Sequence, residues 1–321
     1  MKRFLREIAV IIIAIAASSG ATAQTKWHNP ENAPFPVIQG QKYHGEEREG
    51  FYNRFPARAK DQVRKSVWNL SRQNAGESIV FTTDAKNITV RYTVALRHAM
   101  PHMPSTGVSG VDLYTTDRDG NEIWVAGKYS FKDTVKFSYS KIEPLNMAAE
   151  SHRYTLFLPL YNEVVWMEIG VDEGAEFTFE RASSVKPIVT YGTSICQGAC
   201  ASRPAMAWTN ILQRRLDYPI VNMGFSGSAY FETSVIDALS EIDAAVYVID
   251  GMPNAYTIPA PALQDTLTKA VRQLREKRPD TPIVLVDHCG YSHGAVYKKY
   301  RDAEEHALNA LEEAYQQLRK E

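Results

Sequence analysis

The feature that most constrains the fold is a change of hydrophobic pattern near residue 183 of the 321-residue chain. Before it, short runs rich in β-branched and aromatic residues alternate apolar and polar positions, as half-buried strands do. After it, continuous apolar runs alternate with segments whose apolar residues recur at helical spacing. This change predicts a β half followed by an α/β half.

The β half is predicted to contain short strands separated by turn sequences such as DRDG and YNE. Their number and spacing favour a β-sandwich or jelly roll. One short helix is expected over residues 57–67. The predicted strands cover residues 78–84, 87–94, 111–117, 121–127, 134–139, 153–159 and 163–170.

The α/β half is predicted to be a parallel sheet, because its strands and helices alternate along the chain. Continuous apolar runs indicate that its strands are buried on both faces. In the first helix, the apolar residues expected on one face are Ala205, Trp208, Leu212 and Leu216. The strands are expected at 186–192, 219–224, 243–250 and 281–287, and the helices at 204–216, 232–242, 261–277 and 295–319.

Residues suited to chemistry follow all four predicted parallel strands, whose carboxyl ends share one edge of such a sheet. Ser194, Gly227, Asn254 and His288 come after the first, second, third and fourth strands. Each type alone is common in turns and caps. A serine hydroxyl is a poor nucleophile unless a base takes its proton, and the tetrahedral intermediate that it forms needs preorganised donors.

Three short motifs, in this order, resemble the blocks of the SGNH (GDSL-type) hydrolases: GTSI at 192–195, NMGFSG at 222–227 and GMPN at 251–254. In addition, GVDLY at 110–114 resembles the motif of the GxDLY domain, which precedes one branch of these lipase/acylhydrolase-like proteins. The resemblance implies a flavodoxin-like α/β domain with Ser194 as the nucleophile, and it assigns Gly227 and Asn254 to the oxyanion hole. Thr193 and Met252 depart from the family motifs, which have Asp and Gly there.

The general base of that family is a His in an Asp-x-x-His block beyond the last sheet strand. No such sequence follows Ser194, and the chain ends at Glu321, at the end of a predicted helix. The α/β half is therefore expected to lack its last strand and loop. His288 lies on the expected edge of the sheet and is the candidate substitute base.

The N-terminal residues 1–23 have the charged start, apolar run and Ala-Thr-Ala ending of a signal peptide. Export to the periplasm or outside the cell is expected, without stable membrane insertion, because the apolar run is too short for an anchor. The two further regions expected are a β domain over 24–183 and an SGNH-like domain over 184–321.

Together with the resemblance, these features predict an exported serine ester hydrolase acting on a small ester or an acylated glycan, such as a carbohydrate acetyl esterase. A net charge of −1 excludes strong attraction to nucleic acid. No phosphate-, dinucleotide- or zinc-binding motif occurs, so no cofactor or metal is expected. The oligomeric state is not specified. Two alternatives stay open: a truncated gene product, and an inactive glycan-binding protein using Trp68, Tyr114, Trp124 and Trp166.

Overall fold

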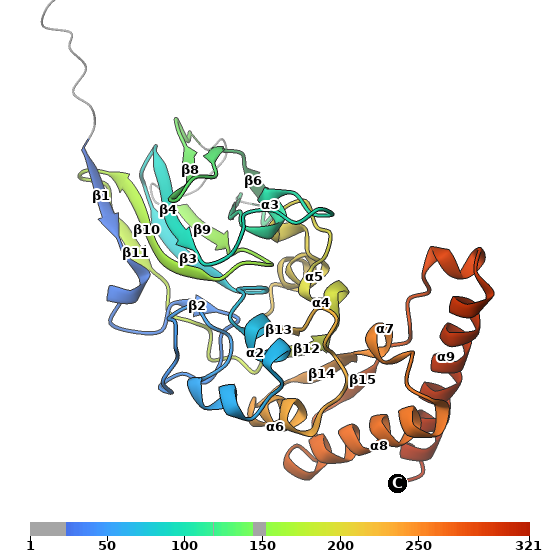
Figure 1. Cartoon of the computed structure of the whole chain (residues 1–321). Coiled ribbons are helices and arrows are strands. Elements are labelled where there is room, and N and C mark those ends of the chain that lie inside the picture. The colour runs from blue at the N-terminus through green and yellow to red at the C-terminus, as the bar shows by residue number, and fades with distance from the viewer. Residues whose placement is uncertain (1–23, 118, 144–151) are drawn as a thin grey trace, which may run out of the picture.

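The structure is a computed structural model that describes residues 24–117, 119–143 and 152–321. The signal peptide expected over residues 1–23 lies outside these ranges. Within them, no helix combines the length and the apolar character needed to cross a membrane. Figure 1 shows antiparallel sheets in the N-terminal half and a parallel sheet in the C-terminal half.

The N-terminal half contains two antiparallel sheets that share one hydrophobic core. Side chains of both sheets, such as Phe81, Tyr92 and Ile169, are fully buried in this core. The first sheet has the order β1 (Thr25–His28), β10 (Val164–Asp172), β4 (Ile88–Val94), β8 (Val135–Tyr139) and β7 (Lys128–Ser130). The second has the order β11 (Phe177–Phe179), β3 (Ser78–Thr83), β9 (His152–Phe157), β5 (Asp112–Thr116) and β6 (Glu122–Val125), and β2 (Ile38–Gln39) also pairs with β3.

All seven strands predicted for this half are present, with ends that differ by a few residues. The sequence patterns did not indicate β1, β2, β7 or β11. These strands are short: β7 and β11 have three residues each, and β7 is exposed throughout. Strands this short form because they can pair with the backbone of a longer neighbouring strand. Side-chain alternation is therefore a poor predictor of them.

The C-terminal half contains the predicted parallel sheet, with the strand order β13 (Ile220–Gly224), β12 (Ile188–Gly192), β14 (Val246–Asp250) and β15 (Ile283–Leu285). All three neighbouring pairs are parallel. In Figure 1, α8 and α9 lie side by side. The helices are α4 (Ser194–Gln197), α5 (Trp208–Leu216), α6 (Thr233–Glu241), α7 (Met252–Ala255), α8 (Ala260–Lys277) and α9 (Lys298–Leu318), and the 3-10 turns are η3 (Pro204–Met206) and η4 (Ser292–Ala295).

Two details of this half differ from the predictions. The predicted apolar face of the first helix is wrong at Leu216, which is 52% exposed, whereas Ala205 is fully buried. The buried residues of α5 itself are Thr209 and Asn210, which make polar contacts. Burial on both faces is also wrong for β15, where Val284 is 47% exposed. Within the described residues β15 pairs with β14 alone and is therefore an edge strand.

The segment between the first two strands and β3 packs against the α/β half. The single helix expected over 57–67 is instead the 3-10 turn η2 (Ala57–Asp61) followed by α2 (Lys65–Ser71). Phe55, Val67 and Trp68 from this segment are buried in the same core as the side chains of the parallel sheet. Figure 1 shows α2 beside β13 and β12. The remaining short elements are η1 (Pro30–Asn32) and α3 (Ser105–Val108).

Candidate active site

Ser194 is the first residue of α4 and follows β12 after a single connecting residue. That residue, Thr193, caps the helix, because its hydroxyl accepts a hydrogen bond from the Ile195 N–H at 3.3 Å. The family's Asp is therefore replaced here by another residue that caps a helix well. Ser194 is partly exposed, as a nucleophile that must reach a substrate has to be.

The register of the parallel sheet places three of the predicted site residues at one edge. Gly192, the last residue of β12, pairs with Gly224 of β13 on one side and with Asp250 of β14 on the other. The carboxyl ends of the three strands are therefore level. Ser194 and Asn254 lie within four residues of two of these ends, on short helical turns, and Gly227 follows the third on a loop.

The amide of Asn254 is oriented by a contact with the loop that carries Gly227. Its Oδ1 accepts a hydrogen bond from the Ala229 N–H at 3.1 Å. The carbonyl end of the amide is thereby engaged, which leaves the Nδ2 end to donate to another acceptor. This hydrogen bond links the segment after β14 to the segment after β13, across the end of β12 that bears Ser194.

Gly227 has the backbone freedom that its position requires. Its φ is +64°, in the left-handed region, and the residue is exposed. A Cβ at this position would have no neighbouring atom within 4 Å. The space on the side of this Cβ is therefore open.

The nucleophile segment is tied to the oxyanion loop and to the β half. The Gln197 side chain accepts a hydrogen bond from the Ser226 N–H at 2.9 Å and donates to the Leu160 carbonyl at 3.2 Å. The Tyr161 hydroxyl donates to the Ser194 carbonyl at 3.2 Å. Residues of the β half therefore hold α4 and the loop before Gly227 in one arrangement.

His288 follows the fourth parallel strand and packs against the segment that carries Asn254, because its ring meets the ring of Tyr256 with centroids 5.4 Å apart. The strand expected over 281–287 ends at Leu285, and His288 follows it in a loop where only 6% of its surface is exposed. Its Nε2 is buried and has no hydrogen-bond partner among the described residues, so it makes no hydrogen bond to Ser194. The rings of Tyr256 and Tyr291 pack against it edge-on.

The hydrogen bonding of His288 defines its protonation. Its Nδ1 accepts a hydrogen bond from the Gly290 N–H at 3.0 Å, so the neutral ring carries its proton on Nε2. Burial also lowers the pKa of His288, which keeps the ring neutral. A general base needs an unprotonated nitrogen that faces the serine. In this arrangement Nε2 carries the proton, so it can only donate a hydrogen bond. Acting as the base would require the hydrogen bond from Gly290 to break.

The sequence analysis did not single out Asp250, a second ionisable group at this edge. It is the last residue of β14 and only 8% exposed. Burial raises the pKa of Asp250 to about 6, with no hydrogen bond or cation to oppose the rise. A buried carboxyl at a strand end, paired in register with Gly192, is the kind of group that functional sites retain. The sequence feature that could have identified Asp250 is its position at the end of a continuous apolar run.

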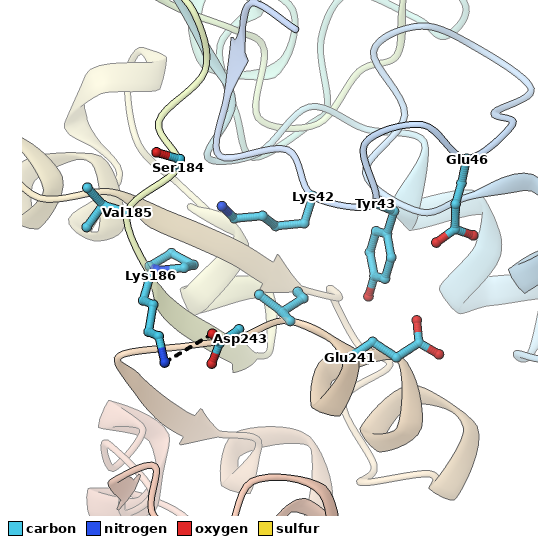
Figure 2. A pocket seen from close by; sticks show the side chains of 10 residues that line it. Lys42, Tyr43, Glu46, Ser184, Val185, Lys186, Glu241 and Asp243 are labelled. Atoms are coloured by element: carbon cyan, nitrogen blue, oxygen red, sulfur yellow. Dashed lines mark ion pairs between the residues drawn. The ribbon is translucent and has the colours of Figure 1, made fainter.

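Two cavities in the described part of the chain lie elsewhere, and neither is lined by Ser194, Gly227 or Asn254. Figure 2 shows the larger, of about 340 Å³, between the 42–46 segment, the 184–187 connection and the turn after α6. It lies at the amino ends of the parallel strands, and its Lys186 is already paired with Asp243 at 3.0 Å. This position argues against a role in catalysis. No group of three metal-ligating side chains occurs among the described residues.

Comparisons with known proteins agree with this architecture. Residues 25–177 match the family described as the N-terminus of Esterase_SGNH_hydro-type. Residues 185–321 match the GDSL-like Lipase/Acylhydrolase family. No curated protein matches the chain.

Solved structures extend the comparison to the whole chain. A GDSL-like lipase from Bacteroides ovatus is 30% identical, with a TM-score of 0.81 over 92% of this chain and 84% of that one. A salicylyl-acyltransferase from a tetracycline biosynthetic pathway is 20% identical, with a TM-score of 0.63 over 91% and 83%. A family two carbohydrate esterase from Cellvibrio japonicus is 12% identical, with a TM-score of 0.53 over 92% and 86%. Because the acyltransferase and the carbohydrate esterase are only 20% and 12% identical to this chain, their similarity shows a shared fold alone. The resemblance seen in the sequence is thus confirmed, and the chain belongs to the GDSL-like lipase/acylhydrolase family with a GxDLY-type N-terminal half.

Proposed function

We propose that the protein is an exported serine esterase that removes acyl groups, acetyl among them, from carbohydrates or small esters. Membership of a lipase/acylhydrolase family supports esterase chemistry. The observation that carries the proposal is the level register of Gly192, Gly224 and Asp250, together with the hydrogen bond that orients Asn254. In this proposal the two antiparallel sheets form a sandwich that supports the nucleophile segment.

Ser194 is the nucleophile in this proposal. Its Oγ attacks the ester carbonyl carbon while its proton passes to a base, and the carbonyl oxygen becomes an oxyanion. The N–H of Gly227 and the Nδ2 of Asn254 donate to that oxyanion. Collapse of the intermediate expels the alcohol, which takes up the proton, and water then releases the acid from Ser194.

The base is the open part of the mechanism. No Asp-x-x-His follows Ser194 in this sequence. His288 stays a prediction for this role, subject to the release of its hydrogen bond from Gly290. The two variants Ser194→Ala and His288→Ala separate these assignments, because groups that act as one catalytic unit lose the same activity when either is removed.

The test is the hydrolysis of 4-nitrophenyl acetate by the wild type, Ser194→Ala and Ser66→Ala, the last altering an exposed serine on α2. We expect Ser194→Ala to abolish turnover and Ser66→Ala to leave it unchanged. Turnover by Ser194→Ala at the wild-type rate would exclude a serine mechanism. In the same assay, equal losses in Ser194→Ala and His288→Ala would identify His288 as the base, whereas a clearly smaller loss in His288→Ala would exclude it.

A second candidate function is glycan binding without catalysis. Of the four aromatic residues considered for it, Trp68 and Tyr114 are buried, at 4% and 7% exposure. Trp124 is 47% exposed and is the observation that favours this alternative. A protein that only binds would bind polysaccharide and show no hydrolysis that depends on Ser194.

A further inference from the structure

A cavity of about 240 Å³ lies in the β half, and none of the three predicted site residues lines it. Its walls come from α3, from strands β5, β6, β7 and β8, and from the segment that follows α4. Strand β6 pairs with β5, whereas β7 pairs with β8, so the chain crosses from one sheet to the other at this place. The cavity therefore opens where the two sheets part.

Two aromatic side chains beside this cavity are exposed. Trp124 is 47% exposed and Tyr129 is 57% exposed. Tyr129 is held by stacking on Phe137, with ring centroids 5.3 Å apart. Single exposed aromatic residues are ordinary on protein surfaces, but two that flank one cavity form a patch that suggests a ligand.

An ion pair between the buried Asp112 and the partly exposed Arg203 forms the polar side of the cavity. The Asp112 carboxylate, 3% exposed, accepts a hydrogen bond from the Trp124 indole N–H at 2.6 Å. Its other oxygen lies 3.0 Å from the Arg203 Nε. The Arg203 guanidinium is 4.4 Å from the centre of the Trp124 ring, and the Nε is buried without a well-aligned hydrogen bond. The motif residue Asp112 thus fixes both side chains.

We propose that this cavity binds one pyranose ring of a neutral glycan. A sugar ring has an apolar C–H face, which stacks on aromatic rings, and hydroxyl groups at its rim, which need donors and acceptors. The volume is smaller than the roughly 300–1,000 Å³ of pockets for drug-sized ligands, and it suits a single ring. Because Asp112 neutralises Arg203, the cavity has no spare charge for an acidic sugar.

The site rests on the proposed function, since the glycan would be the alcohol part of an acylated substrate. Ser202 and Arg203 belong to the segment that follows α4 and therefore connect the cavity to Ser194 along the chain. The β half holds this segment through the Thr106 hydroxyl, which donates to the Ser202 carbonyl at 2.6 Å. One short stretch of chain thus connects the proposed glycan cavity to the segment that carries Ser194.

The test is affinity gel electrophoresis with hydroxyethylcellulose, glucomannan and arabinoxylan as neutral probes, and carboxymethylcellulose as the charged counterpart. We expect at least one neutral probe to retard the wild type and Ser194→Ala, and carboxymethylcellulose to retard them less. Trp124→Ala and Tyr129→Ala should each lose most of this retardation. The matched control is Tyr315→Ala, because Tyr315 is 43% exposed on α9, and it should be retarded like the wild type.

Retardation by none of the neutral probes, or unchanged retardation of both aromatic variants, would overturn the proposed site. Trp124 contacts Asp112 and Arg203, so thermal unfolding should accompany each measurement; if Trp124→Ala does not fold, Tyr129→Ala decides. The two proposals fail separately. Hydrolysis of 4-nitrophenyl acetate, which carries no sugar, should persist in Tyr129→Ala, and only its persistence in Ser194→Ala counts against the esterase.

Discussion

At the scale of single residues, Asn254 is the group whose role the contacts define most closely. Its Oδ1 is engaged by Ala229, so the amide can serve an oxyanion only through Nδ2. We expect Asn254→Ala to lower kcat by about 10²-fold with little change in KM, the usual loss for one oxyanion donor. Asn254→Asp keeps an acceptor for Ala229 and removes the donor. A wild-type kcat in Asn254→Asp, measured on 4-nitrophenyl acetate, would contradict the assignment.

Asp250 leads to a prediction about stability at the same scale. Burial raises its pKa from 3.8 to about 6, so between these values the folded chain binds a proton that the unfolded chain has lost. Stability contributed by this proton is present at low pH and falls as pH rises through the window. Asp250→Asn should therefore stabilise the protein by about 1–3 kcal/mol at pH 8 and by much less at pH 3.5. Urea unfolding at both values checks this, and an equal gain at both would rule out the linkage.

At the scale of elements, the carboxyl end of β13 is held by a side chain from the β half. Arg54, 1% exposed, donates to the carbonyls of Asn222 at 2.9 Å and Gly224 at 3.1 Å. It also donates to the Leu70 and Gln73 carbonyls, at 2.7 and 2.8 Å. One guanidinium thus joins the end of α2 to the strand that leads into Gly227.

Removing this guanidinium should disturb both stability and catalysis. Arg54→Met leaves buried carbonyls without donors, and we expect a loss of about 3–5 kcal/mol in urea unfolding. Arg54→Lys can satisfy some of them and should lose less stability but still lower kcat. The control is Arg58→Met, because Arg58 is 39% exposed in its ion pair with Glu46 and should contribute under about 1 kcal/mol. Equal effects at positions 54 and 58 would refute this role.

The elements also show how far the sequence could predict the structure. Longer strands followed from side-chain alternation and apolar runs, and their ends, together with the family motifs, led to the prediction of Ser194, Gly227 and Asn254 as site residues. The buried face of α5 did not follow, because Thr209 and Asn210 are buried through polar contacts rather than apolar ones. The role of Arg54 could not be found either, since two of its backbone acceptors lie 168 and 170 residues further along the chain.

At the scale of the whole molecule, the two halves share a core although their sequence patterns differ. Phe55 and Val67 from the β half are buried among Tyr191 and Leu239 of the α/β half. The Tyr43 hydroxyl adds a hydrogen bond to the Ala238 carbonyl at 2.7 Å. Neither half can be removed without exposing apolar surface of the other.

This shared core predicts a single unfolding transition. In differential scanning calorimetry we expect the calorimetric and van't Hoff enthalpies of unfolding to agree. The enthalpy of unfolding should be roughly 200 kcal/mol for a chain of about 300 residues that unfolds around 60 °C. Residues 185–321 expressed alone should lack cooperative unfolding, because Phe55, Val67 and Trp68 no longer cover the core. Two separate transitions in the full chain, or cooperative unfolding of the fragment, would contradict this prediction. Either result would mean that each half folds by itself and that Arg54 only connects two independently stable domains.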